Sequence, residues 1–366
     1  MNNKKTPTEN EVKSWLEDGR LVLPPMGFKL RKIQPSYLEN QRWDFELKAF
    51  WDERSAVFAV EYKSIFSPKA FEQALNQCKA ATLPKNYYPL ILLPYLRPAQ
   101  LEALENNRIS GVDWCGNGVV IAADEFRVFR TGNRNQFASY SPIKNIYRKN
   151  TSMVARVFLA SSPFASVSEI VAEVNRRDLL AEATERTPVS MGTVSKALKQ
   201  LEEELIIERG QEIRLLQPDK LLDQLQKNYE PPKLKSLALK VDCAFDQLPQ
   251  LLNTRVEKEA GPLVATGMSS VNRYATMQRE EILSVYCQDA TRVQALLDAS
   301  ASDRFPNVVL FETAEQPFYF DARIEDGFNW ASPVQTYLEL MSGDKRDKET
   351  AEQVQAYILR RLGERN

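Results

Sequence analysis

A short apolar run that closes on charged residues constrains the fold of this chain most strongly. The run spans residues 57–63 and ends with an acidic and a basic residue two positions apart, Glu61 and Lys63. A strand points residues two apart to the same face, so these two side chains project together. Asp44 and Glu46 project together by the same rule in a second run upstream. Three carboxylates and one ammonium group on adjacent strands can hold a hard divalent cation beside a phosphodiester.

The first 150 residues alternate between strand-like and helix-like patterns. Residues 87–93 are continuously apolar, as expected for a strand buried on both faces of a sheet. Ser67 and Pro68 begin a helix whose apolar residues recur at helical spacing. This order predicts a mixed sheet with helices packed on it. The expected elements are helices at 12–16, from 67 onwards and at 97–106, and strands at 28–33, 43–50, 57–62, 87–93, 111–114 and 119–122.

The composition excludes several classes of site. The chain has 366 residues, enough for two or three domains, and it contains no histidine. That absence excludes Ser-His-Asp and Cys-His catalysis, zinc sites with histidine ligands, and the usual general base at neutral pH. The 4 cysteines are far apart, so we expect reduced thiols in a cytoplasmic protein. No signal peptide or run of ~20 apolar residues is evident, so no membrane partner is expected.

The charge is distributed unevenly although the net charge is only -1. Residues 1–150 carry 22 Lys and Arg against 16 Asp and Glu, whereas residues 230–366 carry 16 against 21. Residues 151–229 carry 10 against 12. The first block is therefore the one that would attract a polyanion, with an excess that predicts weak, salt-sensitive non-specific affinity.

The pattern of the first block resembles the PD-(D/E)xK restriction-endonuclease-like superfamily, and more closely its Mrr-like branch. The resemblance covers residues 28–130 and rests on Asp44, on Glu61 and Lys63, and on the helix and strand that follow. It implies that Asp44 and Glu61 are ligands of a Mg²⁺ ion and that Lys63 is the catalytic lysine. The protein would then be a Mg²⁺-dependent endodeoxyribonuclease.

Further residues belong to the same resemblance. Gln73 or Gln77, on the helix after the lysine, would correspond to the glutamine that many such enzymes place near the site. Residues 111–113 match a later strand of the superfamily. Trp43 precedes the aspartate where the superfamily name has proline, which is a departure that the superfamily tolerates.

The same residues also have an ordinary structural interpretation. Glu61 and Lys63 on an exposed strand can form a solvated ion pair that adds little stability. Glu46 is either a third ligand or, in the simpler interpretation, a surface acid. Asp113, at a strand end, is expected to cap a turn. Nuclease-like folds are also retained for DNA binding without cleavage, so both functions remain open.

Residues 151–229 predict three helices followed by a β-hairpin, which is the order of elements in a winged helix. Ser166 is a good N-cap for the second helix, with Glu169 at the capping-box position, and Ser190 caps the third. The expected elements are helices at 153–159, 167–174 and 191–204, a hairpin at 205–216 with its turn at Gly210, a helix at 221–225, and a linker at 229–232.

The third of these helices has the composition of a DNA-reading helix. Such a helix lies in the major groove, and its first residues are small, polar or basic. The pattern at 189–202 resembles bacterial winged-helix regulators. The candidates for contact with double-stranded DNA are Ser190, Thr193, Ser195, Lys196 and Lys199 on the helix and Arg209 and Arg214 on the hairpin, and Arg176 and Arg177 are further candidates for phosphate. A merely solvated charged face, or a winged helix used for protein contacts, is the alternative.

The last block, residues 230–366, mixes helices and apolar strands. Residues 266–275 follow an apolar strand with a glycine-serine turn, a junction that can bind an anion at a helix N-terminus or simply connect two elements tightly. Together with 307–310 and 331–340, this segment resembles the C-terminal domain of antitoxins from abortive-infection (type IV) toxin–antitoxin systems, which is distantly similar to nucleotidyltransferases. The strand at 283–287 carries no carboxylate pair, so we expect binding or scaffolding. Expected elements are helices at 245–252, 271–277, 293–297, 334–340 and 350–361, and strands at 263–266, 283–286, 308–311 and 318–320.

The expected architecture is α/β and multidomain. It comprises a restriction-endonuclease-like domain at 1–150, a winged helix at 151–229 and a nucleotidyltransferase-like α/β domain at 230–366. The leading function is a cytoplasmic DNA-binding protein of a bacterial defence locus, and the sequence leaves open whether its nuclease-like domain cuts DNA with Mg²⁺. The alternatives are a non-enzymatic repressor of the antitoxin type, paired with a cognate toxin protein, and an assembly module without a role on DNA.

Overall fold

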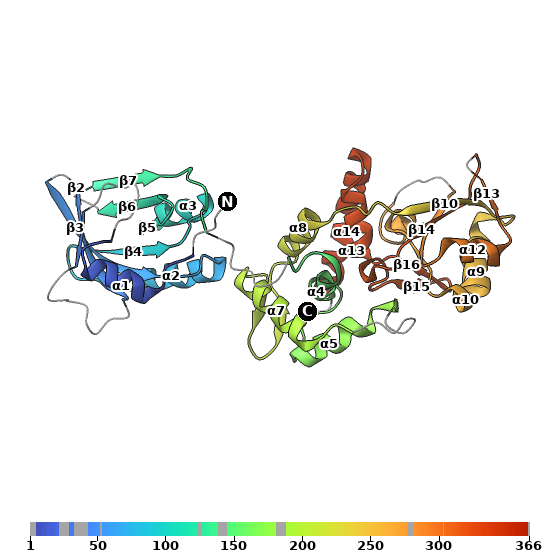
Figure 1. Cartoon of the computed structure of the whole chain (residues 1–366), viewed down its shortest axis with the longest axis horizontal. Coiled ribbons are helices and arrows are strands. Elements are labelled where there is room, and N and C mark those ends of the chain that lie inside the picture. The colour runs from blue at the N-terminus through green and yellow to red at the C-terminus, as the bar shows by residue number, and fades with distance from the viewer. Residues whose placement is uncertain are drawn as a thin grey trace. The chain divides into compact units, whose positions relative to one another are not determined.

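The chain is a mixed α/β protein that divides into two compact units, Met1–Pro142 and Ile143–Asn366 (Figure 1). The structure is a computed structural model. It describes residues 5–21, 29–32, 43–51, 53–122, 126–137, 145–180, 188–276, 281–302 and 304–364. Within the described part, both large sheets combine parallel and antiparallel pairs.

The first unit contains one sheet whose strands lie in chain order from β1 to β7. β3, β4 and β5 pair in parallel, and the other neighbours pair antiparallel. The elements are α1 (Glu9–Glu17), β1 (Lys29–Lys32), β2 (Phe45–Trp51), β3 (Arg54–Tyr62), α2 (Pro68–Ala80), β4 (Tyr87–Leu93), α3 (Pro98–Asn106), β5 (Ser110–Asp113), β6 (Gly118–Ala122) and β7 (Phe126–Arg130). The predicted order of elements is confirmed, and β7 is an addition.

Helices cover both faces of this sheet, which explains why β3 and β4 are mainly apolar. Val12 and Leu16 of α1 pack against one face, which includes Phe58 and Val60. The apolar stripe of α2 packs against the other face together with α3. Parallel central strands covered on both sides lose the alternation of polar and apolar residues that marks a half-exposed strand.

The second unit begins with the predicted helices and hairpin. Ser166 Oγ accepts a hydrogen bond from the backbone N–H of Glu169, and Ser190 Oγ accepts one from Thr193. Glu169 does not complete a capping box, because its carboxylate accepts instead from the backbone N–H of Ala165. The elements are η1 (Lys149–Thr151), α4 (Ser152–Ala160), α5 (Val167–Arg176), α7 (Met191–Glu203), β8 (Ile207–Arg209), β9 (Ile213–Leu215) and α8 (Pro218–Asn228).

The rest of the second unit is built on a seven-stranded sheet with the order β13-β10-β14-β12-β11-β16-β15. Its strands are β10 (Lys235–Lys240), β11 (Val264–Ala265), β12 (Leu283–Cys287), β13 (Ser300–Ala301), β14 (Val308–Glu312), β15 (Arg323–Glu325) and β16 (Phe328–Trp330). Its helical segments are η2 (Phe245–Gln247), α9 (Leu248–Leu252), η3 (Asn253–Glu257), α10 (Lys258–Ala260), α11 (Gly267–Ser270), η4 (Val271–Arg273), α12 (Ala290–Leu297), η5 (Gln316–Phe318), α13 (Pro333–Met341) and α14 (Lys345–Gly363).

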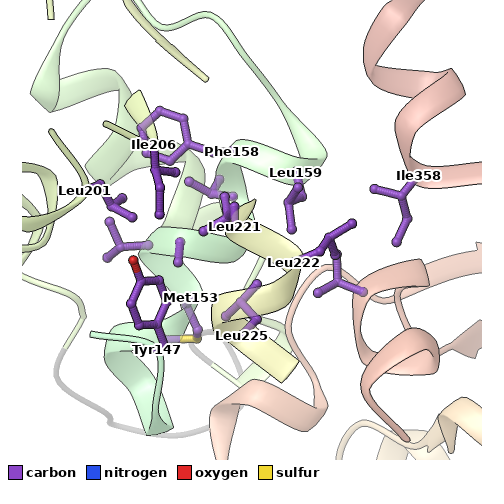
Figure 2. Packing of buried hydrophobic residues seen from close by; sticks show 14 of the residues in the cluster. Tyr147, Met153, Phe158, Leu159, Leu201, Ile206, Leu221, Leu222, Leu225 and Ile358 are labelled. Atoms are coloured by element: carbon purple, nitrogen blue, oxygen red, sulfur yellow. The ribbon is translucent and has the colours of Figure 1, made fainter. Parts of the chain in front are cut away.

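One hydrophobic cluster joins the two parts of the second unit. Figure 2 shows Phe158 of α4 and Leu221 and Leu222 of α8 in the cluster that also contains Ile358 of α14. Residues of α13 belong to it as well. The helices that follow η1 are therefore not packed as an isolated small domain, because they share their core with the C-terminal helices.

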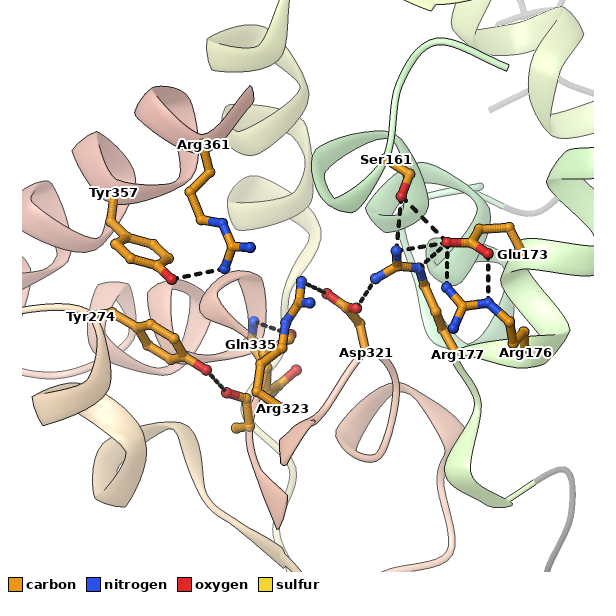
Figure 3. A network of polar contacts seen from close by, with 12 residues as sticks. Ser161, Glu173, Arg176, Arg177, Tyr274, Asp321, Arg323, Gln335, Tyr357 and Arg361 are labelled. Carbon is orange, nitrogen blue, oxygen red and sulfur yellow. Dashed lines mark hydrogen bonds and ion pairs between the residues drawn. The ribbon is translucent and has the colours of Figure 1, made fainter. Parts of the chain in front are cut away.

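A polar network crosses the same contact (Figure 3). Arg177 pairs with Glu173 on its own helix and with Asp321, which also accepts a hydrogen bond from Arg323 at 2.9 Å. Hydrogen bonds from Arg176 and then Arg177 hold the pKa of Glu173 at about 2. The prediction that Arg177 contacts phosphate is therefore wrong, since its side chain is only 10% exposed and is already paired.

One expectation for the last block is wrong, and the structure decides between the two interpretations of the glycine-serine turn. Residues 318–320 do not form a strand: Phe318 ends the 3₁₀ segment η5, and Phe320 makes only an isolated bridge to Asp178. The glycine-serine turn at Gly267 is a tight connection whose N-terminus is occupied by the protein itself. The Glu339 carboxylate accepts a hydrogen bond from the backbone N–H of Met268 at 3.1 Å, so an external anion would meet a negative charge there.

The Gly267 position allows α11 and α13 to approach closely. A Cβ atom at this residue would lie 2.8 Å from the Cα of Thr336 and 2.8 Å from the Cδ of Glu339. Real Cβ atoms do not come so close to backbone atoms, so any larger residue must displace one of the two helices.

We expect Gly267→Ala to lower the free energy of unfolding by about 1–3 kcal/mol through this overlap. The matched control is Gly192→Ala on α7, where the nearest atom to the new Cβ is Ser190 Oγ at 3.8 Å. That change should raise stability by about 0.5–1 kcal/mol, because alanine is the better helix former. Urea unfolding monitored by circular dichroism measures both. Equal effects of the two substitutions would contradict the close approach at Gly267.

Candidate functional site

The strand register of the first unit brings Asp44 next to Glu61. β2 and β3 pair antiparallel, and the last pair in the ladder is Phe45 opposite Val60. One residue further on, Asp44 therefore lies opposite Glu61, and its backbone N–H donates to the carbonyl of Val60 at 3.0 Å. The Asp44 carboxylate also accepts a hydrogen bond from the backbone N–H of Tyr62 at 2.7 Å. These bonds fix the aspartate at the end of β3.

Lys63 and Gln77 both bind the Glu61 carboxylate. The Lys63 ammonium group pairs with Oε1, and the Gln77 side-chain amide donates to Oε2. Gln77 reaches this point because it follows the buried face of α2, whereas Gln73 is exposed. Of the two glutamines that the sequence left open, Gln77 is therefore the one at the site. The four residues predicted to be catalytic therefore lie at the same end of β3: Asp44, Glu61, Lys63 and Gln77.

Burial sets the electrostatics of the two acids. Glu61 lies under α2 and is only 3% exposed, so desolvation raises its pKa, and the bonds from Lys63 and Gln77 offset part of that effect. Asp44 adds a smaller repulsion in the same direction. Desolvation likewise raises the pKa of Asp44, opposed mainly by the Tyr62 N–H. The interpretation of Glu61 and Lys63 as a solvated surface ion pair is therefore wrong, because Glu61 is buried.

Two charged residues of α1 also act on Asp44 and were not anticipated from the sequence. Glu9 raises the pKa of Asp44 and Lys13 lowers it, while these two side chains pair with each other at 2.5 Å. The Tyr62 hydroxyl donates to the carbonyl of Pro7 and so ties the start of this helix to β3. The sequence does contain a sign of this helix: Thr8 and Glu11 form a capping box, which predicts a helix that begins at Glu9.

Glu46 and Asp113 have structural partners. The expectation that Glu46 is a surface acid is wrong, because it is 6% exposed and accepts a hydrogen bond from the Tyr87 hydroxyl at 3.1 Å. The turn-capping role expected for Asp113 is confirmed, since its carboxylate accepts backbone hydrogen bonds from Leu96, Cys115 and Asn117. All four cysteines are free thiols.

The donor set at Asp44 and Glu61 fits a hard divalent cation. Both ligands would be carboxylate oxygens, the donors that Mg²⁺ prefers, and a cation between them would offset the desolvation that raises both pKa values. Only two protein carboxylates meet there. Across the described residues, no group of three or more Asp, Glu, Cys or His side chains could hold a metal ion. Magnesium commonly keeps several waters, so two carboxylates are compatible with it.

In the second unit, α7 presents the predicted polar residues on its exposed side. Val194, Ala197, Leu198 and Leu201 are buried, so Ser195, Lys196 and Lys199 project to solvent. Neither lysine forms an ion pair with a residue that the structure describes. Ser190 and Thr193 are used in part for capping, because their hydroxyl groups lie 3.1 Å apart and the Thr193 N–H donates to Ser190.

The hairpin carries the two predicted arginines close to acidic neighbours. Arg209 lies 3.9 Å from Glu202, and Arg214 lies 3.7 Å from Glu212. Such exposed pairs are weak, so the arginines can exchange these partners for phosphate. Phe164 exchanges two backbone hydrogen bonds with Ile213, which makes an isolated β-bridge beside the two-stranded hairpin.

Comparisons with known proteins identify no relative. No family model matches the chain, and neither a curated protein nor a solved structure matches it. Among the described helices, none has both the length and the apolar composition needed to cross a membrane.

We expect Glu61→Gln to stabilise the first unit at neutral pH, by on the order of 1 kcal/mol, because it removes a buried charge. The raised pKa means that ionisation of Glu61 weakens folding above the unfolded-state pKa and has no effect below it. The gain should therefore disappear as the pH falls below about 4.5. Thermal unfolding between pH 4 and pH 8 measures this difference.

The matched control for that substitution is Glu72→Gln on the exposed side of α2. It should change stability by less than about 0.5 kcal/mol at any of these pH values. A variant Glu61→Gln that is less stable than the unchanged protein at pH 8 would show that the Lys63 pair outweighs the cost of burial.

Proposed function

We propose that the chain is a DNA-binding protein with a Mg²⁺-dependent nuclease-like site in its first unit. The observation that carries this proposal is the meeting of Asp44, Glu61, Lys63 and Gln77 at one end of β3. The resemblance to PD-(D/E)xK nucleases assigns chemistry to the same four positions. The basic balance of residues 1–150 supports a polyanionic substrate.

Each residue has a definite role in this proposal. Asp44 and Glu61 would hold the metal ion, which when bound supplies positive charge at the scissile phosphate and lowers the pKa of a coordinated water. Lys63, 31% exposed, would orient the attacking water and stabilise negative charge on the phosphate. Gln77 fixes the Glu61 carboxylate so that the lysine does not have to hold it alone.

The helices and hairpin of the second unit would select the DNA in the manner of a winged helix. The support is the exposed row of Ser195, Lys196 and Lys199 on α7, followed by a hairpin with Arg209 and Arg214. Serine and lysine side chains at the start of a helix suit the major groove and its phosphates. A defence locus of a bacterium is the proposed setting, with the chain in the cytoplasm.

A second candidate function is a non-enzymatic repressor of the antitoxin type, which binds its own promoter and opposes a toxin protein. The observation that favours it is the shared core between the DNA-reading helices and the C-terminal helices α13 and α14. Such packing would couple a partner bound to the C-terminal part to the position of α7. Cleavage would be absent under this alternative, and DNA binding would remain.

We expect Lys63→Ala to abolish Mg²⁺-dependent nicking of DNA in a protein that still folds, with a lower stability because buried Glu61 loses its ion-pair partner. Loss of the ammonium group should lower the rate by roughly 10²–10³-fold, as for other groups that stabilise charge in a transition state. The control is Lys79→Ala, an exposed lysine near the end of α2. Agarose gels of supercoiled plasmid, including DNA with modified bases, measure the outcome. Intact DNA with both Mg²⁺ and Mn²⁺ would leave the repressor as the surviving candidate.

We expect Lys196→Ala and Lys199→Ala to weaken DNA binding and to reduce its salt dependence. Each lost phosphate contact should reduce the slope of log K against log salt concentration by about 1. Lys227→Ala, an exposed lysine on α8, serves as the matched control. Fluorescence anisotropy with DNA from upstream of the gene, measured at several salt concentrations, provides the test. Unchanged slopes would remove α7 from the DNA interface.

A further inference from the structure

A cavity of about 320 Å³ lies in the second unit, where the segment after α8 passes over the sheet. Its lining includes Tyr229, Pro231 and Pro232 from that segment, and Tyr286 and Phe311 from the sheet. Ser284, Thr266 and Ser342 contribute hydroxyl groups at its border. The cavity is large enough for a small organic molecule. None of the residues predicted to bind DNA or metal lines it.

Three of the residues that line this cavity are aromatic: Tyr229, Tyr286 and Phe311. Tyr286 packs against Phe311 with ring centroids 6.3 Å apart, and against Phe318 at 4.8 Å. Tyr229 is the third aromatic residue of the lining. Aromatic faces carry negative charge density, so a set of rings around one space favours a positively charged guest.

One carboxylate, Glu339, lines the same cavity and is only partly exposed. Its Oε1 atom accepts hydrogen bonds from the Tyr286 hydroxyl at 2.8 Å and from the Gln335 amide at 2.9 Å. Its Oε2 atom accepts from the Met268 N–H at 3.1 Å, and the Gly267 N–H contributes as well. These four donors use the acceptor capacity of a carboxylate, which has about four lone-pair positions.

Burial raises the pKa of the Glu339 carboxyl, and its four hydrogen-bond donors oppose that shift. No basic side chain of a described residue lines the cavity beside it. In the part of the chain that the structure describes, Glu339 forms no ion pair. Arg156 is linked to Glu339 only through Gln335. The Gln335 side chain accepts a hydrogen bond from Arg156 at 2.8 Å and donates one to Glu339. Arg156 is itself buried and also donates to the carbonyl of Pro317 at 2.9 Å. It therefore lies behind the wall of the cavity rather than in it.

We infer that this cavity is a binding site for a small organic cation of the quaternary ammonium type. The rings of Tyr229, Tyr286 and Phe311 would surround the cationic head, and the Glu339 charge would attract it. Because protein donors already occupy the lone pairs of Glu339, a ligand needs positive charge but no N–H group. A methylated ammonium group meets this condition, whereas a primary ammonium group would lose hydrogen bonds to water on entry.

Other ligand classes fit the same lining less well. An anion would meet the Glu339 charge with no basic side chain in the lining to offset it. A divalent metal ion would find a single carboxylate that is already saturated by donors. A neutral apolar molecule would gain from the rings but nothing from the charge. The inference is independent of DNA binding and of the site at Glu61.

Isothermal titration calorimetry with the full-length protein tests this site directly. The probes are tetramethylammonium chloride and choline chloride, and the control ligand is 3,3-dimethyl-1-butanol, the uncharged carbon analogue of choline. We expect saturable binding of one equivalent of each cation. The neutral analogue should bind at least about tenfold more weakly, because it has the shape of choline without the charge.

Two variants test the lining and one serves as a control. Glu339→Gln keeps the size of the side chain and should weaken choline binding by at least about tenfold. Ser342→Trp places a large side chain at an exposed position of the border and should abolish binding without altering the carboxylate. Glu352→Gln, on the exposed side of α14, should leave binding unchanged. Circular dichroism and thermal unfolding verify that each variant is folded.

Three results would overturn the inference. They are the absence of saturation by either cation up to about 50 mM, equal binding of choline and its neutral analogue, and unchanged choline binding by folded Ser342→Trp. If Glu339→Gln does not fold, the comparison of choline with its analogue and the Ser342→Trp variant still decide the question.

Discussion

The burial of Glu61 beneath α2 is the constraint on which the candidate site in the first unit depends. A carboxylate in this position must be hydrogen bonded and paired, because an isolated buried charge is unstable. Lys63 and Gln77 meet that need from two directions, and the backbone at Tyr62 holds the neighbouring Asp44. A protein with no functional use for this arrangement would be more stable with an apolar residue there. The buried acid is thus the observation that best supports the chemistry proposed for this site.

Most of the first unit could be predicted from the sequence, and the reason lies in its long, well-separated elements. β3, α2 and β4 form where apolar runs and a Ser-Pro helix start predict them. The proximity of Asp44 to Glu61 follows from strand alternation once the hairpin between β2 and β3 is fixed. The burial of Glu61 could not be predicted, because it depends on how α2 lies across the sheet. Local patterns specify which face of a helix is apolar but not what that face covers.

The last block was predicted less well because burial and strand pairing are separate properties. Phe318, Tyr319 and Phe320 are buried, which their apolar character indicates, yet they pack their side chains from a turn rather than from a strand. The hairpin of β15 and β16 was missed although its signal is strong. Asp326 and Gly327 both have positive φ, 53° and 73°, as a tight type I′ connection requires.

The shared core and the Arg177–Asp321 pair change how the second unit can be divided. Helices α4 to α8 contribute apolar side chains to a cluster that α13 and α14 complete, so a chain cut after Asn228 would expose that surface to water. Transfer of the helices and hairpin alone into another protein would expose the same apolar surface. The smallest cassette that evolution or an engineer can move between proteins is therefore the whole segment from Ile143 onwards.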